Sequence, residues 1–212
     1  MSSNFRYNQY DFPIIAFIWQ ALKSLGFSLN DWKEKYMQPP NLSERVEVSA
    51  HAPSTDSFEV LCHLFATWLT DELEEVTHAI VLGGDTFKDL WGTPHVIGKF
   101  ESRRSDIVKG PTSIVSALIN TDPNGLVSSF GQACAYKLFS HKSYLALPCQ
   151  TASDELIRMQ SICQIFGIGL VTFNNISPTQ PDFQLMVRAT KHEPDLFYTN
   201  WYVAHVEKEL FA

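Results

Sequence analysis

The 212-residue chain lacks the patterns that indicate metal, disulfide or nucleotide chemistry. Its four cysteines form no C-x-x-C pair, and its seven histidines form neither H-x-x-x-H nor H-E-x-x-H. No G-x-G-x-x-G or Walker sequence occurs. Ser113 and Ser116 have no identifiable His–acid partners, which leaves a serine hydrolase with little support. We therefore expect the cysteines to be small buried hydrophobes in a reducing compartment, not zinc ligands or disulfides.

Long hydrophobic runs are also missing. The longest apolar run, "FPIIAFIW", is far shorter than the roughly 20 residues that a membrane-spanning helix needs. The first residues show no charged segment followed by an apolar one, so no signal peptide is predicted. These two absences predict a cytoplasmic protein without a membrane partner.

An excess of positive charge is the third absence. The formal net charge is −7 and the pI is about 5.4. Nucleic-acid binding without sequence preference depends on phosphate neutralisation, so this balance argues against a uniformly basic binding surface. It leaves open a local basic face. Hydrophobic residues make up 45% of the chain and charged residues 18%, which is typical of a globular protein.

The N-terminal quarter is predicted to be a helical extension. Apolar residues at spacings of three and four predict a helix at 11–25, and a short helix follows at 30–37. The segment 39–56, "PPNLSERVEVSAHAPSTD", is the most loop-like part of the chain. We therefore predict an extension at 1–52 and a second domain at 53–212.

Beyond the loop, the hydrophobic period alternates between that of helices and that of strands. The predicted elements are a helix at 57–75, strands at 78–84, 105–110 and 112–120, a helix at 126–139, a strand at 142–148, a helix at 151–167, a strand at 168–174, an alternating segment at 182–189 and a helix from about residue 194. The segment "VIGKFES" (96–102) is expected to be an ordinary amphipathic strand or loop. The order α-β-β-β-α-β predicts an α/β fold with a mixed sheet flanked by helices.

This element order, together with certain motifs, resembles the PD-(D/E)XK nuclease superfamily. "SD" at Ser105 and Asp106 is placed on the second strand, the third strand follows twelve residues later, and "GQAxxY" lies on the next helix. "FGQACAYKLFSHKSYLALP" and "CQIFGIGLVTF" carry the more specific part of the resemblance, which covers about 57–175. It implies a restriction-endonuclease-like fold with an α-β-β-β-α-β core. Ser105 departs from the motif's proline.

The resemblance implies a site in which two carboxylates and a lysine act on a phosphate. Mg²⁺ prefers oxygen ligands, and a lysine two residues after the second acid shares its strand face. Asp106 matches the first acid, but Leu118 stands at the second acid and Asn120 at the lysine. Gln132 and Tyr136, at i and i+4, match the helix beside such sites. These five positions are therefore predicted to be vestigial catalytic positions.

A relocated metal site is the alternative. Glu101 or Asp122 could join Asp106 as ligands for Mg²⁺ or Mn²⁺. The simpler interpretations are a surface partner of an arginine for Glu101 and a turn residue in "NTDPNG" for Asp122. No metal or other cofactor is expected unless the protein is an active endonuclease.

A set of basic side chains near these positions is predicted to contact nucleic acid if its members converge. They are Arg103, Arg104, Lys109, Lys137, His141 and Lys142.

Three functions are compatible with these features of the sequence. The leading hypothesis is a catalytically inactive nuclease-fold protein that binds DNA or RNA, or acts as a non-cleaving subunit or partner in a complex. The second is an active metal-dependent endonuclease with relocated carboxylates. The third is a protein-interaction scaffold, with a protein partner or a second copy of the chain, because a fold does not fix a function.

Overall fold

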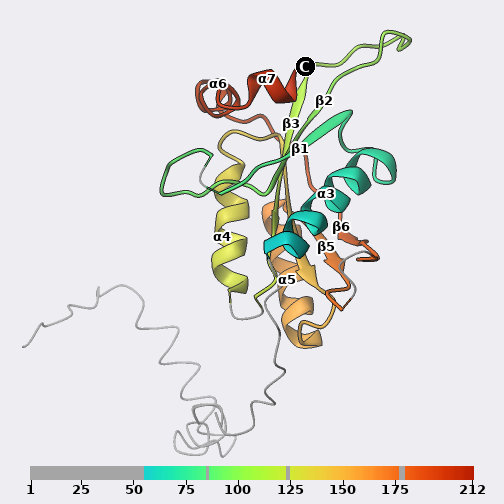
Figure 1. The fold of residues 1–212 in the computed structure, drawn as a ribbon, viewed down its shortest axis with the longest axis vertical. Helices are drawn as coiled ribbons and strands as arrows, with labels where there is room; N and C mark the ends of the chain where they lie inside the picture. The colour runs from blue at the N-terminus through green and yellow to red at the C-terminus, as the bar shows by residue number, and fades with distance from the viewer. Residues whose placement is uncertain (1–54, 85, 123–124, 177–179) are drawn as a thin grey trace, which may run out of the picture. The chain divides into compact units, whose positions relative to one another are not determined.

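The alternating helix and strand patterns fold into a layered α/β structure in the computed structural model (Figure 1). It describes residues 55–84, 86–122, 125–176 and 180–212, within one compact unit, Ala50–Ala212. The helices predicted at 11–25 and 30–37, and the boundary between 1–52 and 53–212, lie outside the described residues.

A six-stranded mixed sheet forms the centre of this unit. Its strands lie side by side in chain order. They are β1 His78–Val81, β2 Val96–Phe100, β3 Ser113–Ile119, β4 Lys142–Pro148, β5 Gly169–Phe173 and β6 Gln184–Val187. β1, β2 and β3 pair antiparallel, β3, β4 and β5 pair parallel, and β6 pairs antiparallel with β5. The predicted mixed sheet is thus confirmed.

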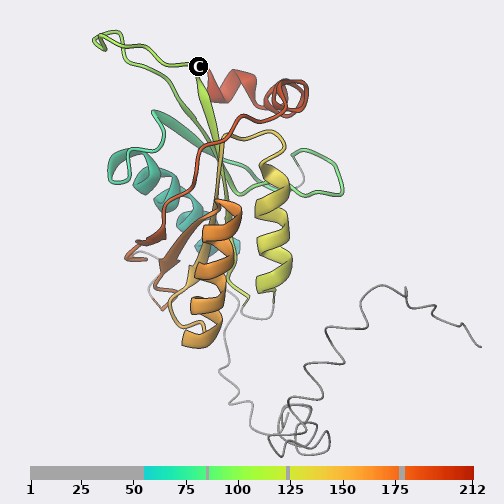
Figure 2. The same cartoon turned by 180° about the vertical axis from the view of Figure 1, so that it is seen from behind.

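Helices cover both faces of the sheet. They are α3 Thr55–Asp71, α4 Leu126–Tyr136, α5 Ser153–Phe166, α6 Leu196–Val203 and α7 Glu207–Leu210. α3 lies on one face, while α4 and α5 lie on the other, as the two opposite views show (Figures 1 and 2). The elements follow the order α3-β1-β2-β3-α4-β4, but the second strand is not the segment predicted for it. None of the described helices combines the length and apolar character needed to cross a membrane.

The central strand β3 explains why both faces need a cover. All seven of its residues are buried. Ile114 and Leu118 pack into the hydrophobic cluster that includes α4 and α5 residues. Val115, Ala117 and Ile119 pack into the second cluster, with α3 residues. This alternation follows from the two-residue period of strands, and it produces the continuous apolar run that the sequence displays.

Local chemistry fixes several helix ends. Gly167 ends α5 with φ of +67°, a left-handed conformation that glycine adopts without steric cost. The side chain of Asp195 caps α6 by accepting hydrogen bonds from the backbone N–H groups of Phe197 and Tyr198. The glycine stop of α5 agrees with the helix predicted at 151–167.

The second strand lies elsewhere than predicted. Residues 105–110 are not a strand, but belong to a long loop, 101–112, that connects β2 to β3. The real second strand is β2, in the segment that the sequence predicted as an ordinary strand or loop. The physical reason is burial: four of the five β2 residues are buried, whereas residues 105–110 are all exposed. Their two apolar side chains, Ile107 and Val108, are adjacent in the chain and would point to opposite faces of a strand, so they form no apolar face.

Candidate functional site

Leu118 and Asn120 occupy the C-terminal end of β3. Leu118 is 5% exposed and is part of the apolar cluster beneath α4. Asn120 is 8% exposed, and its Oδ1 accepts a hydrogen bond of 2.7 Å from the backbone N–H of Asp122. The Asn120 side-chain Nδ2 is buried without a partner. This strand end therefore presents an apolar side chain and a neutral amide.

His95, and not Asp106, is the residue of the second strand region that faces this strand end. Its backbone N–H donates to the carbonyl of Ala117 at 2.9 Å, and its ring Nδ1 accepts from the backbone N–H of Ile119 at 3.0 Å. Sequence reasoning missed His95 because it placed the second strand at 105–110. The available signal was Pro94 and His95 directly before the short apolar run that becomes β2.

Burial keeps the His95 ring neutral. The pKa of His95 falls from its usual 6.5 to about 4, because burial penalises the charged imidazolium. The ring also packs edge-on against Phe58, with the ring centroids 4.9 Å apart. The neutral His95 ring therefore packs beside β3, at a place where a metal-dependent nuclease would need a carboxylate ligand.

The lowered pKa of His95 predicts acid sensitivity. Between pH 6.5 and 4 the His95 ring is protonated in the unfolded chain but stays neutral in the folded protein. The free energy of unfolding therefore falls as the pH falls through this window. We expect His95 alone to make the protein about 2 kcal/mol less stable at pH 5 than at pH 7.5. Urea unfolding across this range should show that His95→Gln flattens the pH dependence.

The control is His63→Gln, which changes an exposed histidine of α3. Burial also lowers the pKa of His141, which therefore contributes its own pH dependence of stability. His95→Gln should remove only the part of this pH dependence that comes from His95. Equal pH slopes in wild type and His95→Gln would contradict the assignment.

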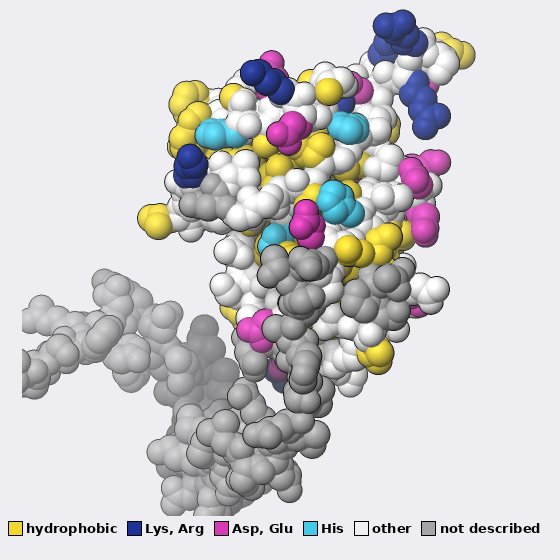
Figure 3. Space-filling view, viewed as in Figure 1, with side chains coloured by type: hydrophobic (Ala, Val, Ile, Leu, Met, Phe, Trp, Pro, Cys, Tyr) yellow, Lys and Arg dark blue, Asp and Glu magenta, His cyan; other side chains and the backbone are white. Residues whose placement is uncertain are grey.

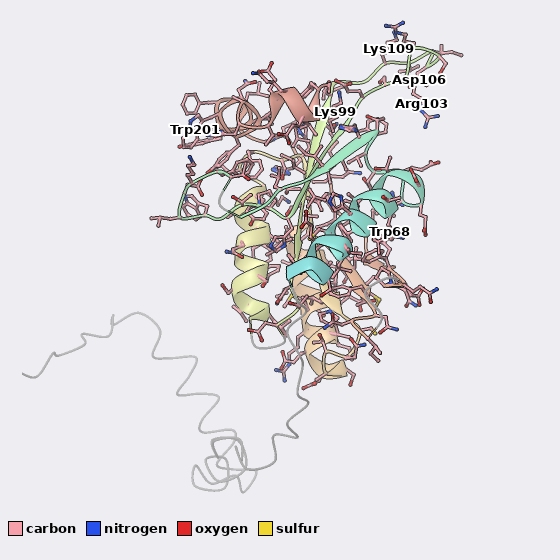
Figure 4. All side chains as sticks on the ribbon, viewed as in Figure 1. Trp68, Lys99, Arg103, Asp106, Lys109 and Trp201 are labelled. Atoms are coloured by element: carbon pink, nitrogen blue, oxygen red, sulfur yellow. The ribbon has the colours of Figure 1, made fainter. Side chains whose placement is uncertain are left out.

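Asp106 lies on an exposed loop and not beside Leu118. Its backbone N–H donates to the carbonyl of Arg103 at 3.1 Å, and its carboxylate Oδ2 accepts from the backbone N–H of Arg103 at 2.6 Å. Asp106 therefore closes a turn at the outer end of the 101–112 loop, where Figure 4 shows it. Its predicted placement on the second strand is wrong.

The alternative carboxylates do not converge either. Glu101 follows β2 and pairs with Lys99, with an Nζ–Oε2 distance of 3.1 Å. Glu101 lies near the start of β3, because Phe100 pairs with Ser113, whereas Asp122 follows the end of β3. The strand between them spans about 20 Å at about 3.3 Å per residue, so the two carboxylates are far apart. Among the described residues, no group of three His, Cys, Asp or Glu side chains is placed to hold a metal ion.

The predicted basic set divides into four separate environments. Arg103, Arg104 and Lys109 share the exposed 101–112 loop, which carries a concentration of dark-blue side chains (Figure 3). Lys137 follows the C-terminal end of α4, and its Nζ donates to the carbonyl of Phe166 at 2.9 Å. The loop therefore holds half of the predicted set.

The two remaining members of the basic set serve the fold. His141 is buried, and its Nδ1 accepts a hydrogen bond from the backbone N–H of Ile114 at 3.0 Å. His141 thus exposes little of its surface, and its ring is engaged within the fold. The ammonium of Lys142 pairs with the buried carboxylate of Glu75, which also accepts from Arg188 at 2.6 Å.

Gln132 and Tyr136 do share one face of α4, as their spacing predicts. A side chain at Gly92 would meet both, since a Cβ there would lie 3.2 Å from Gln132 Nε2 and 3.6 Å from the Tyr136 hydroxyl. The Tyr136 hydroxyl is buried without a partner, and burial, with Asp89 nearby, raises its pKa. The hydroxyl of Tyr202 donates to Asp89. These residues join the β1–β2 connection to α4 and α6.

Two adjoining pockets lie beside the end of α3, and the first of them extends along the edge strand β1. Their volumes are about 460 and 510 Å³, and both are lined by Thr70, Asp71 and Thr77. The second pocket reaches the base of the 101–112 loop at Glu101 and Arg103. Acidic side chains thus lie beside the base of a loop whose outer part is basic.

No protein-family model, curated protein or solved structure matches the chain. The function must therefore be inferred from the fold and from the placement of these residues.

Proposed function

We propose that this protein binds nucleic acid through the 101–112 loop and does not cleave it. The scaffold is proposed to be restriction-endonuclease-like, and the order α3-β1-β2-β3-α4-β4 supports this assignment. At the strand ends where such a nuclease would hold its acids and lysine, this chain has His95, Leu118 and Asn120. Their side chains are neutral or apolar, so they offer no anionic metal ligand and no cation to the phosphate.

The exposed loop cations are the observation that carries the binding proposal. Arg103, Arg104 and Lys109 are all exposed on one loop. The two carboxylates of the loop are already engaged, because Asp106 accepts from the Arg103 backbone and Glu101 pairs with Lys99. The three cations are therefore available to neutralise phosphates on a protein whose overall charge is −7.

The distance of the loop from the acidic body strengthens this interpretation. The loop projects away from the sheet and the helices (Figures 1 and 4). The five residues between the end of β2 and the outer turn of the loop reach up to about 17 Å when extended, at about 3.3 Å per residue. The Debye length is about 8 Å at physiological ionic strength. Salt thus screens Arg104 and Lys109, at the outer part of the loop, from most acidic groups of the body, whereas Arg103 also lines the pocket that holds Asp71 and Glu74.

The triple variant Arg103→Ala, Arg104→Ala, Lys109→Ala is expected to bind a labelled DNA duplex at least about tenfold more weakly at low salt. The slope of log K against log salt should shrink by about 2.7, at about 0.9 for each of three lost phosphate contacts. Fluorescence anisotropy across a salt series measures both quantities.

The matched control removes three exposed cations from elsewhere, as Arg158→Ala, Lys191→Ala, Lys208→Ala, and has the same net charge. It should keep the wild-type salt slope. Absence of wild-type binding at low salt would refute the proposal and favour a protein-interaction scaffold. Cleavage of the duplex with Mg²⁺ or Mn²⁺ would refute its non-cleaving part.

A further inference from the structure

The outer end of the 101–112 loop carries an apolar pair as well as cations. Ile107 is 101% exposed and Val108 is 85% exposed. Single exposed aliphatic residues are common, but here two adjacent ones lie between Arg104 and Lys109 on a projecting segment. Among the described residues, neither side chain has a partner that covers it. This combination is typical of a contact surface that is apolar at its centre and cationic at its edges.

The loop is held in shape by its own hydrogen bonds. The two bonds between Arg103 and Asp106 close the turn just before the apolar pair. Nearer the sheet, the hydroxyl of Ser102 accepts from the backbone N–H of Gly110 at 2.8 Å. A contact surface that is ordered before binding loses less conformational entropy on binding. Asp106, which looked catalytic in the sequence, thus orders the apolar pair and the cations around it.

We infer that the tip enters the minor groove of duplex DNA, where Ile107 and Val108 wedge against a base step while Arg103, Arg104 and Lys109 hold the phosphates on either side. This inference rests on the proposed function and names its substrate class. Proteins that bend DNA from the minor groove use this pairing of aliphatic wedges with cations, because the wedge unstacks bases and the cations hold the bent backbone. The minor groove of an RNA helix is wide and shallow, so a narrow tip gains less there.

An anionic lipid surface is the competing partner for a basic and apolar tip. One feature favours DNA over it: two aliphatic side chains and three cations give a membrane anchor only a small apolar contribution.

The test compares wild type with the variant Ile107→Ser, Val108→Ser, which keeps every charge. The probe is a 30-base-pair DNA duplex with a fluorophore pair at its ends and a 2-aminopurine at its centre. Wild type should increase energy transfer between the ends, which reports bending, and should brighten the 2-aminopurine, which reports unstacking. The variant should lose both signals and bind about tenfold more weakly, while its salt slope stays that of wild type. Both side chains are exposed, so the thermal midpoints of the two proteins should agree.

Four results would overturn the wedge. Equal bending by wild type and the serine variant would do so, as would wild-type binding without bending; both leave the proposed nucleic-acid binding intact. Stronger binding to vesicles containing phosphatidylserine than to DNA, lost in the serine variant, would replace DNA by a lipid surface. Absence of any DNA binding at low salt would refute the wedge and the proposed function together, so the two failures are distinguishable.

Discussion

Replacing Gly169 with alanine is expected to lower the free energy of unfolding by more than about 3 kcal/mol. Gly169 begins β5 beside Tyr144 of β4, and a Cβ built there would lie 2.1 Å from Cδ1 of the tyrosine ring. The ring is fully buried and cannot move aside without displacing its neighbours. Urea unfolding of Gly169→Ala should show a much lower midpoint, or the variant should fail to fold.

The same substitution at Gly131 is the control. Gly131 lies inside α4, and a Cβ there would meet nothing within 4 Å. Gly131→Ala is therefore expected to stabilise the protein by up to about 1 kcal/mol, because alanine favours a helix interior. Opposite signs for the two variants would confirm that the close approach to Tyr144 decides the effect. A Gly169→Ala protein as stable as wild type would refute the packing at this position.

Neutralising Glu75 is expected to cost about 3 kcal/mol, the usual scale for breaking a buried ion pair on one side. The Glu75 side chain is 2% exposed and binds Lys142 of β4 and Arg188, which follows β6. Tyr144 also forms a hydrogen bond to it, and burial, with Glu75 close by, raises the pKa of that hydroxyl. Glu75→Gln keeps the shape of the side chain and removes its charge, so Lys142 would lose its counter-charge.

Glu72→Gln is the matched control, since Glu72 is exposed and lies in the same short segment after α3. It should change stability by less than about 0.5 kcal/mol. Urea unfolding at pH 7 measures both variants. Equal effects of Glu75→Gln and Glu72→Gln would show that this ion pair does not hold the end of α3 to the sheet.

These two sites converge on Tyr144 and form part of the structure that supports β4. Gly169 leaves room for the tyrosine ring, and the polar group around Glu75 receives its hydroxyl. The predicted role of Lys142 in binding nucleic acid competes with this structural role, because its ammonium already has a partner. The binding proposal therefore rests on Arg103, Arg104 and Lys109, which are exposed on the 101–112 loop.

Sequence patterns were sufficient where a residue's role depends on its neighbours in the chain. The period of apolar residues located β3, β4 and β5 and the helices between them. The spacing of Gln132 and Tyr136 placed both on one face of α4, and Gly167 ended α5 as expected. These features follow from local geometry, since the periods of helices and strands and the conformation of glycine need no distant partner.

Tertiary structure decided which strand lies beside β3, and with it the candidate site. Asp106 resembled a catalytic acid only while residues 105–110 were taken for a strand; pairing instead brings β2 beside β3 and places His95 at the strand end. Strand pairing joins segments far apart in the chain, and the side that is buried depends on the whole sheet. The sequence by itself determined that Leu118 and Asn120 carry neither acid nor base. Only the fold decided that Asp106 orders a projecting loop, because an exposed turn and a short exposed strand look alike in one sequence.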